Sequence, residues 1–124
     1  MSRVLLVEAD DLIRASLTKA LGRFGHEVIA TSSAREALAS MSRHHPDVIL
    51  TEHLLGGDIT GSMMLEHCAL VSPDCARVLM SSGDLPKKVL RRGAHDVYLA
   101  KPFSIHVVAA TLGDLSSRDQ PKAA

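Results

Sequence analysis

The chain has 124 residues, of which 46% are hydrophobic and 23% charged, a composition typical of one soluble globular domain. Fourteen lysine and arginine residues balance fourteen aspartate and glutamate residues, so no net charge would steer the chain toward nucleic acid or anionic lipid. Its few aromatic side chains, Phe24, Phe103 and Tyr98, leave no stacking surface for single-stranded nucleic acid.

The cysteine and hydropathy patterns predict a cytoplasmic protein. Cys68 and Cys75 have neither the spacing of a zinc site nor that of a CxxC redox motif, and we expect both thiols to be reduced. The apolar stretch from Val4 to Val7 is too short for a signal peptide. No apolar run approaches the roughly 18 residues that a membrane helix requires, so we expect no membrane partner.

In chain order, short apolar runs alternate with amphipathic stretches. The apolar runs predict five β-strands, near residues 4–7, 27–31, 47–51, 76–81 and 95–100. The amphipathic stretches predict helices that start at Asp10 or Asp11, at Ser32 or Ser33, near Thr60, at Pro86 and at Ser104. Stop signals end the first four at Gly25, His44, Pro73 and Gly93, and the last helix runs to about Leu115. Glu36 stands at capping-box distance from Ser33.

Five strand–helix units with nearly continuous apolar strands indicate a parallel sheet that is buried on both faces. Right-handed crossovers of this length give a doubly wound α/β fold, a flavodoxin-like three-layer sandwich of the (βα)5 type. We expect the strand order 2-1-3-4-5, with one domain over residues 1–116 and a flexible tail over residues 117–124.

Four of the predicted strands end on residues that carry chemistry. Glu8 follows the first strand, Glu52 the third, Ser82 the fourth and Lys101 the fifth. Sheets of this kind place their sites at the carboxyl ends of the strands, beside the point where the strand order reverses. We therefore expect these four side chains to meet in one site.

This order of carboxylates, a further carboxylate, a hydroxyl and then Lys101-Pro102-Phe103 resembles the receiver domain of bacterial two-component response regulators, over roughly residues 3–116. The resemblance implies a phosphoacceptor at the end of the third strand, which takes a phosphoryl group from a histidine kinase. It also implies a magnesium ion, held by acids at the end of the first strand, that neutralises charge during phosphoryl transfer.

At two of the matching positions the chain departs from the family pattern. Glu52 stands where the family has the phosphoaccepting aspartate, and Ala9 stands where a metal-binding aspartate is expected. Alanine offers no oxygen to a hard cation, so the acidic pocket is reduced to Glu8 and Asp10. We expect neither a cofactor nor a metal ion; weak magnesium binding by Glu8, Asp10 and Glu52 is the alternative.

Glu52 has one methylene more than aspartate, which places its carboxylate roughly 1.5 Å further out. We expect it to reach Lys101 or Ser82 without being phosphorylated. It would then imitate the modified state in part, with about one negative charge in place of nearly two. The alternative is a structural ion pair without a role in signalling.

The resemblance also assigns the residues around the phosphoryl group. Ser82 matches the switch hydroxyl, Lys101 matches the lysine that pairs with the acceptor, and Tyr98 matches the aromatic residue whose rotamer reports activation. A cis peptide is implied between Lys101 and Pro102.

The segment between Ser82 and Gly93 is about four residues shorter than the family pattern, which corresponds to about one turn of the fourth helix. In receivers this helix belongs to the face used for output and dimerisation. The resemblance implies that the face formed by the fourth helix, fifth strand and fifth helix binds a protein partner, either a sensor histidine kinase or an output protein. We expect a monomer or a weak dimer.

These observations favour a phosphorylation-independent protein-interaction module in signal transduction, without enzymatic activity. The alternative is a working receiver that catalyses its own magnesium-dependent phosphorylation on Glu52 or on a nearby aspartate, such as Asp10 or Asp58. A flavodoxin-type cofactor binder would share only the fold, because the chain has no phosphate loop rich in Ser, Thr and Gly after the first strand.

Overall fold

The computed structural model describes residues 2–81, 85 and 95–118. Its elements are β1 (Arg3–Val7), α1 (Asp11–Arg23), β2 (Glu27–Thr31), α2 (Ala34–His44), β3 (Val48–Glu52), α3 (Gly61–Val71), β4 (Ala76–Ser81), β5 (Val97–Ala100) and α5 (Ile105–Arg118). Each lies where the apolar periodicity predicted it. Two predictions fall outside the described residues. One is the helix over residues 86–92, which was expected to be about one turn shorter than in the family pattern. The other is the switch hydroxyl of Ser82.

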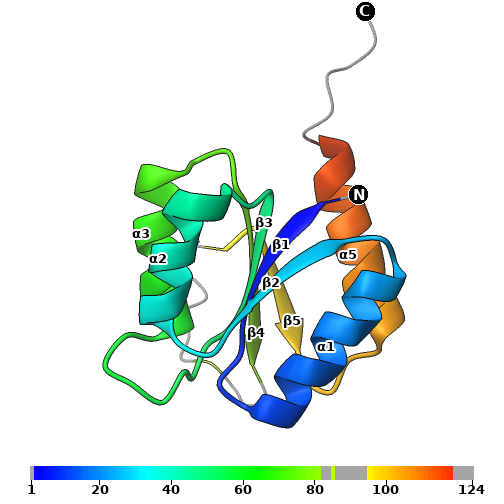
Figure 1. Ribbon diagram of the computed structural model, residues 1–124, viewed down its shortest axis with the longest axis horizontal. Helices are drawn as coiled ribbons and strands as arrows, with labels where there is room; N and C mark the ends of the chain where they lie inside the picture. Colours follow the sequence, from blue (N-terminus) through cyan, green and yellow to red (C-terminus); the bar gives the residue numbers. More distant parts are fainter. Residues whose placement is uncertain (1, 82–84, 86–94, 119–124) are drawn as a thin grey trace, which may run out of the picture.

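The strands form one parallel sheet in the order β2-β1-β3-β4-β5, which confirms the predicted topology. Helices α1 and α5 cover one face of the sheet and α2 and α3 cover the other, so that the molecule has three layers (Figure 1). The strand order reverses between β1 and β3, the neighbours whose carboxyl ends carry Glu8 and Glu52.

Both faces of the sheet are buried, as the continuous apolar strands predicted. Successive side chains of β1 point to opposite faces: Val4 and Leu6 pack toward α1 and α5, whereas Leu5 and Val7 pack toward α2 and α3. All four are 0% exposed. The two apolar layers hold the strands rigidly, so that the ends of the strands provide a fixed base for the side chains that follow them.

Side-chain caps fix the starts of the helices. Of the two aspartates predicted to start α1, Asp10 is the N-cap, and its Oδ1 accepts a hydrogen bond from the Ile13 N–H at 2.9 Å. Ser33 caps α2 by accepting from the Glu36 N–H at 3.2 Å, and Glu36 reaches back to accept from the Ser32 N–H at 3.0 Å. This reciprocal pair is the predicted capping box, except that Glu36 accepts from the N–H of Ser32 and not from that of the N-cap residue Ser33.

Several boundaries differ from the sequence prediction by one to three residues. Strand β3 extends to Glu52, and β5 begins at Val97 because Asp96 instead bonds the start of β4, with its Oδ2 accepting from the Arg77 N–H at 2.8 Å. Helix α5 runs to Arg118, three residues past the predicted helix end at about Leu115. Over the described ranges, none of the helices has the length and apolar character needed to cross a membrane.

Candidate functional site

The carboxyl ends of β1, β3 and β5 bring three charged side chains together. Glu8, directly after β1, is 2% exposed, and Glu52, the last residue of β3, is 5% exposed. Lys101 follows β5, and its Nζ donates a hydrogen bond to Glu8 Oε1 at 2.7 Å. The same Nζ lies 2.5 Å from Glu52 Oε2. We call these three side chains the carboxylate–lysine cluster.

The cluster sets two buried carboxylates against one ammonium group. The side chains of Glu8, Glu52 and Lys101 are 3%, 7% and 16% exposed. Burial alone would lower the pKa of Lys101, but the contacts and charges of Glu52 and Glu8 outweigh it and raise that pKa. Lys101 is therefore charged at neutral pH and pairs with both carboxylates. Glu52 Oε2 forms an ion pair with Nζ, although the angles at this contact are poor for a hydrogen bond.

Strand register sets the position of each member of the cluster. Val7 pairs with Thr51 across β1 and β3, so that the residues that follow them, Glu8 and Glu52, leave the sheet side by side. The Lys101 N–H donates to Ser81 O at 2.8 Å, which extends the β4–β5 pairing to the lysine itself. The peptide bond between Lys101 and Pro102 is cis, the geometry that the resemblance implies.

The start of α3 presses directly on the backbone of Glu52. A Cβ atom on Gly61 would lie 2.0 Å from the carbonyl oxygen of Glu52, so only glycine fits at this position. The Gly61 N–H donates to His53 O at 2.7 Å. Next to it, His53 Nδ1 and Ser62 Oγ form a buried hydrogen bond of 3.0 Å. The end of β3 is thus clamped from the α3 side, which fixes the direction in which Glu52 leaves the strand.

The structure separates Glu8 from Asp10, the two acids that were predicted to share a pocket. Asp10 and Ala9 are exposed, and Asp10 Oδ1 is used as the cap of α1. Arg14, which the sequence analysis did not single out, takes the neighbouring place: it donates to Glu8 O at 2.9 Å and to Asp11 Oδ1 at 2.6 Å. Asp11 and Arg14 are three residues apart on a predicted helix, and this spacing is the feature of the sequence from which their ion pair could have been predicted.

The side chains at this edge do not fit the magnesium ion that the resemblance implies. Magnesium demands oxygen ligands in near-octahedral geometry. Ala9 supplies none, Asp10 Oδ1 accepts from the Ile13 N–H as the cap of α1, and the carboxylates of Glu8 and Glu52 face the ammonium of Lys101. Among the described residues, His, Cys, Asp and Glu side chains nowhere form a group of three or more that could hold a metal ion.

Two further predicted site residues are Tyr98 and Asp58. Tyr98 is half-buried against the apolar layer on the α2/α3 side, with its ring centroid 6.2 Å from that of His95. Asp58 is exposed in the loop between β3 and α3, where it lines a pocket of about 500 Å³ beside Ser33 and Arg35. Ser82, as noted, is outside the described residues.

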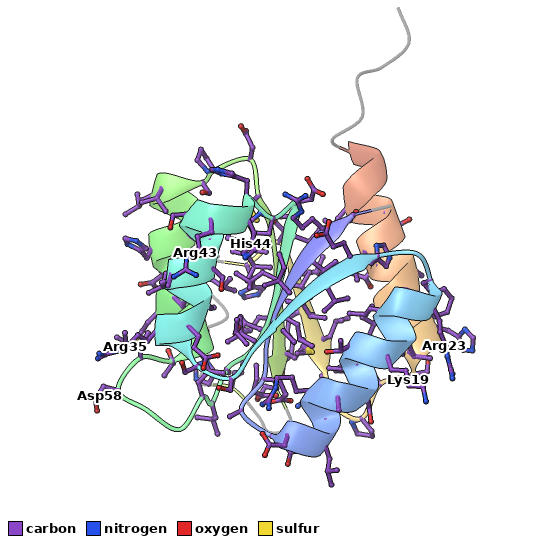
Figure 2. The ribbon with its side chains drawn as sticks, viewed as in Figure 1. Lys19, Arg23, Arg35, Arg43, His44 and Asp58 are labelled. Carbon is purple, nitrogen blue, oxygen red and sulfur yellow. The ribbon has the colours of Figure 1, made fainter. Side chains whose placement is uncertain are left out.

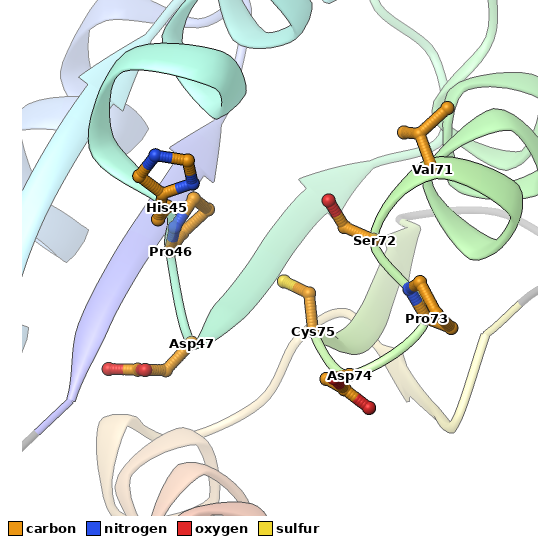
Figure 3. A pocket seen from close by; sticks show the side chains of 8 residues that line it. All are labelled: His45, Pro46, Asp47, Val71, Ser72, Pro73, Asp74 and Cys75. Carbon is orange, nitrogen blue, oxygen red and sulfur yellow. The ribbon is translucent and has the colours of Figure 1, made fainter.

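Two further hollows lie among the described residues. A groove of about 490 Å³ runs beside the cluster between α1 and the turn before α5, lined by Leu12, Ile13, Ser16, Leu17, Lys101, Pro102 and Phe103. A larger pocket, of about 790 Å³, lies at the opposite edge of the sheet, between the loops that precede β3 and β4 (Figure 3). The polar ends of His45, Asp47 and Asp74 point in different directions around it, so they do not define a common ligand.

Comparisons with known proteins agree on one family. Residues 4–112 match the model of the response regulator receiver domain. The virulence transcriptional regulatory protein PhoP of Salmonella choleraesuis is 34% identical over 121 residues, which cover 96% of this chain and 54% of that protein. The DNA-binding transcriptional regulator NtrC of Azospirillum brasilense is 29% identical over 124 residues, covering 98% of this chain and 25% of that protein. The chain thus spans about a quarter to about half of the length of these relatives.

Solved structures share the architecture. A two-component response regulator from Clostridium difficile superposes with a TM-score of 0.88 at 20% identity, covering 98% of this chain and 100% of that chain. A response regulator receiver domain protein from Clostridium thermocellum gives a TM-score of 0.87 at 21% identity, over 95% of this chain and 96% of that one. At these identities the two structures show the fold alone.

Proposed function

The chain belongs to the response regulator receiver family, and from that premise we propose that it acts in signal transduction as a phosphorylation-independent protein-interaction module. The observation that carries this proposal is the carboxylate–lysine cluster. Lys101, the residue that matches the family's phosphoryl-contacting lysine, is already held by two carboxylates of its own chain, Glu8 and Glu52.

Phosphoryl transfer depends on positioning and on neutralising the charge that develops on the phosphoryl oxygens. A metal ion supplies much of that neutralisation, and the residues at this edge do not fit one. The ammonium group of Lys101 is also paired with the two glutamates. An incoming phosphoryl group would therefore have to displace Glu8 or Glu52 from Lys101. Both electrostatic contributions to the reaction are therefore reduced.

We place the partner-binding surface on the face that includes β5 and α5, together with the fourth helix. The segment predicted to form the fourth helix lies outside the described residues, whereas α5 presents Val107, which is 47% exposed. The partner is a sensor histidine kinase or an output protein, the classes with which receivers interact. An output protein suits the proposal better, because a module that takes no phosphoryl group has no need of a phosphoryl donor.

The test is the intact mass of the protein after incubation with acetyl phosphate and magnesium. We expect the unmodified chain to gain no phosphoryl group. The variant that carries Ala9→Asp together with Glu52→Asp restores both family residues and should gain one phosphoryl mass. The two single variants are the matched controls, and they show which of the two positions limits the reaction.

A phosphoryl group on the unmodified chain would overturn the proposal in favour of a working receiver. Mapping of the modified residue would then separate Glu52, buried at the end of β3, from the exposed carboxylates of Asp10 and Asp58. Loss of the modification when magnesium is removed would identify it as the family's metal-dependent reaction.

A further inference from the structure

Helix α1 carries opposite charges at its two ends. Asp11 lies in its first turn with its side chain 87% exposed, and Arg23 lies in its last turn. Figure 2 shows Lys19 and Arg23 projecting from the outer side of α1, away from the sheet. In the part of the chain that the structure describes, neither of these two cations has an ion-pair partner. Asp11 uses Oδ1 for Arg14, which leaves Oδ2 available.

The outer side of α1 also carries an exposed leucine, Leu12, and a glycine with open space around it, Gly22. Leu12 is 82% exposed. Gly22 is exposed, and a Cβ atom built on it would meet nothing within 4 Å. Leu12, Ala15, Lys19 and Gly22 follow one another at spacings of three or four residues and so share one helix face. At about 1.5 Å per residue, Leu12 and Gly22 lie about 15 Å apart along the axis.

We propose that α1 of one copy of this chain packs antiparallel against α1 of a second copy. A two-fold interface is isologous, which means that each contact between two different residues occurs twice. Antiparallel packing brings Asp11 of one copy beside Arg23 of the other, and Leu12 of one copy over Gly22 of the other. Both contacts repeat at the opposite end of the interface.

The charge pattern together with Leu12 and Gly22 favours a second copy as the occupant of the α1 face. Helix α2 also has an acid in its first turn and bases in its last, but none of the exposed large apolar side chains lies on it. A different protein would need a basic segment at one end of α1 and an acidic segment at the other, and α1 itself supplies that sequence when it is reversed. The two ion pairs would lie about 18 Å apart along the helix, which exceeds the Debye length of about 8 Å at physiological salt. They therefore act independently, and because exposed pairs are weak, the dimer is weak and dissociates as the salt concentration rises.

The experiment is sedimentation equilibrium of the full 124-residue chain up to millimolar concentration, at low and at high salt. Arg23→Glu and Asp11→Arg each replace two attractions by two repulsions, and each should raise the dimer dissociation constant about tenfold or more. The double variant that combines them exchanges the two charges and should return the dissociation constant to near that of the unmodified chain. Arg43→Glu reverses a charge at an exposed position of α2; it is the control and should leave the dimer dissociation constant unchanged.

A second variant tests the apolar contact without altering any charge. Gly22→Gln places a side chain in a position that is empty in the single chain, so the fold tolerates it, but it occupies the space of Leu12 from the second copy. We expect it to weaken dimerisation with an unchanged circular dichroism spectrum. A chain that is monomeric at every concentration overturns the inference, and so does a charge-exchanged double variant that dimerises no better than the single variants.

Discussion

Removal of the ammonium group of Lys101 should be one of the most destabilising single changes in this chain. Lys101→Met keeps the length and the apolar stem of the side chain but leaves Glu8 and Glu52, which are 3% and 7% exposed, without a counter-charge. Removing one partner of a buried ion pair costs about 3–5 kcal/mol, because the other charge is left buried and uncompensated. That is a large share of the roughly 5–15 kcal/mol by which a domain of this kind is stable.

The matched variant at the other side of the cluster should behave differently. Glu52→Gln keeps the shape of the side chain and removes one of two carboxylates that share one ammonium, while Lys101 retains Glu8 at 2.7 Å. We expect the free energy of unfolding to change by less than about 1 kcal/mol. Glu27→Gln is the control for an exposed pair, since Arg3 and Glu27 are 42% and 57% exposed, and it should cost no more than about 1 kcal/mol.

Urea unfolding followed by circular dichroism gives these free energies by linear extrapolation, with an uncertainty of about 10–15%. The expected separation between Lys101→Met and Glu52→Gln is well outside that uncertainty. If Lys101→Met costs no more than the exposed control Glu27→Gln, the cluster is solvated rather than buried, and the argument from desolvation is refuted. If Glu52→Gln costs as much as Lys101→Met, the folded state requires the charge of Glu52, and Glu8 alone is not a sufficient partner for Lys101.

Three further outcomes follow from the structure. Folding raises the pKa of Lys101 above its ordinary value of 10.5. Its stabilising contribution is therefore complete below pH 10.5 and is lost as the pH rises through the raised pKa. The free energies of unfolding in urea of the unmodified chain and of Lys101→Met should converge in strongly alkaline solution. Gly61→Ala would force a Cβ atom to within 2.0 Å of Glu52 O and should cost at least about 3 kcal/mol, whereas Gly57→Ala, with open space around it, should stay within about 0.5 kcal/mol. Ser33→Ala removes the cap of α2 and should lower stability by about 1 kcal/mol, measurable as a lower melting temperature.

The fold was predictable because its signals are local. Each strand is an apolar run of four to six residues, and each start of a helix carries a side chain that can cap it, such as Asp10 or Ser33. Strand order then follows from general rules on crossovers, without knowledge of any particular contact. The position of Glu8, Glu52 and Lys101 at one edge follows from the same rules, because the carboxyl ends of parallel strands share an edge.

The contacts inside the site were less predictable because they depend on three-dimensional distance. Asp10 has the chemistry of a metal ligand and that of a helix cap, and only the backbone path shows that the cap prevails. The hydrogen bond between His53 and Ser62 joins residues nine positions apart across the β3–α3 connection, and no periodicity predicts it. The need for glycine at position 61 likewise arises from the carbonyl of Glu52, which the sequence does not place.

On the proposed function, the two departures from the family pattern have separate effects, Ala9 on metal binding and Glu52 on the ammonium group of Lys101. Ala9 removes a carboxylate that would compete for cations, and the longer side chain of Glu52 brings its oxygen to 2.5 Å from Lys101 Nζ. An aspartate would end roughly 1.5 Å short of that oxygen, at the outer limit of an ion pair. A phosphoryl group can be removed, whereas Glu52 is permanent, so any bias that it gives to the conformation of the domain is constant. On the proposed function, the charge of the site does not change with signalling. Partner binding would then be regulated through the concentration of the partner or of the domain itself.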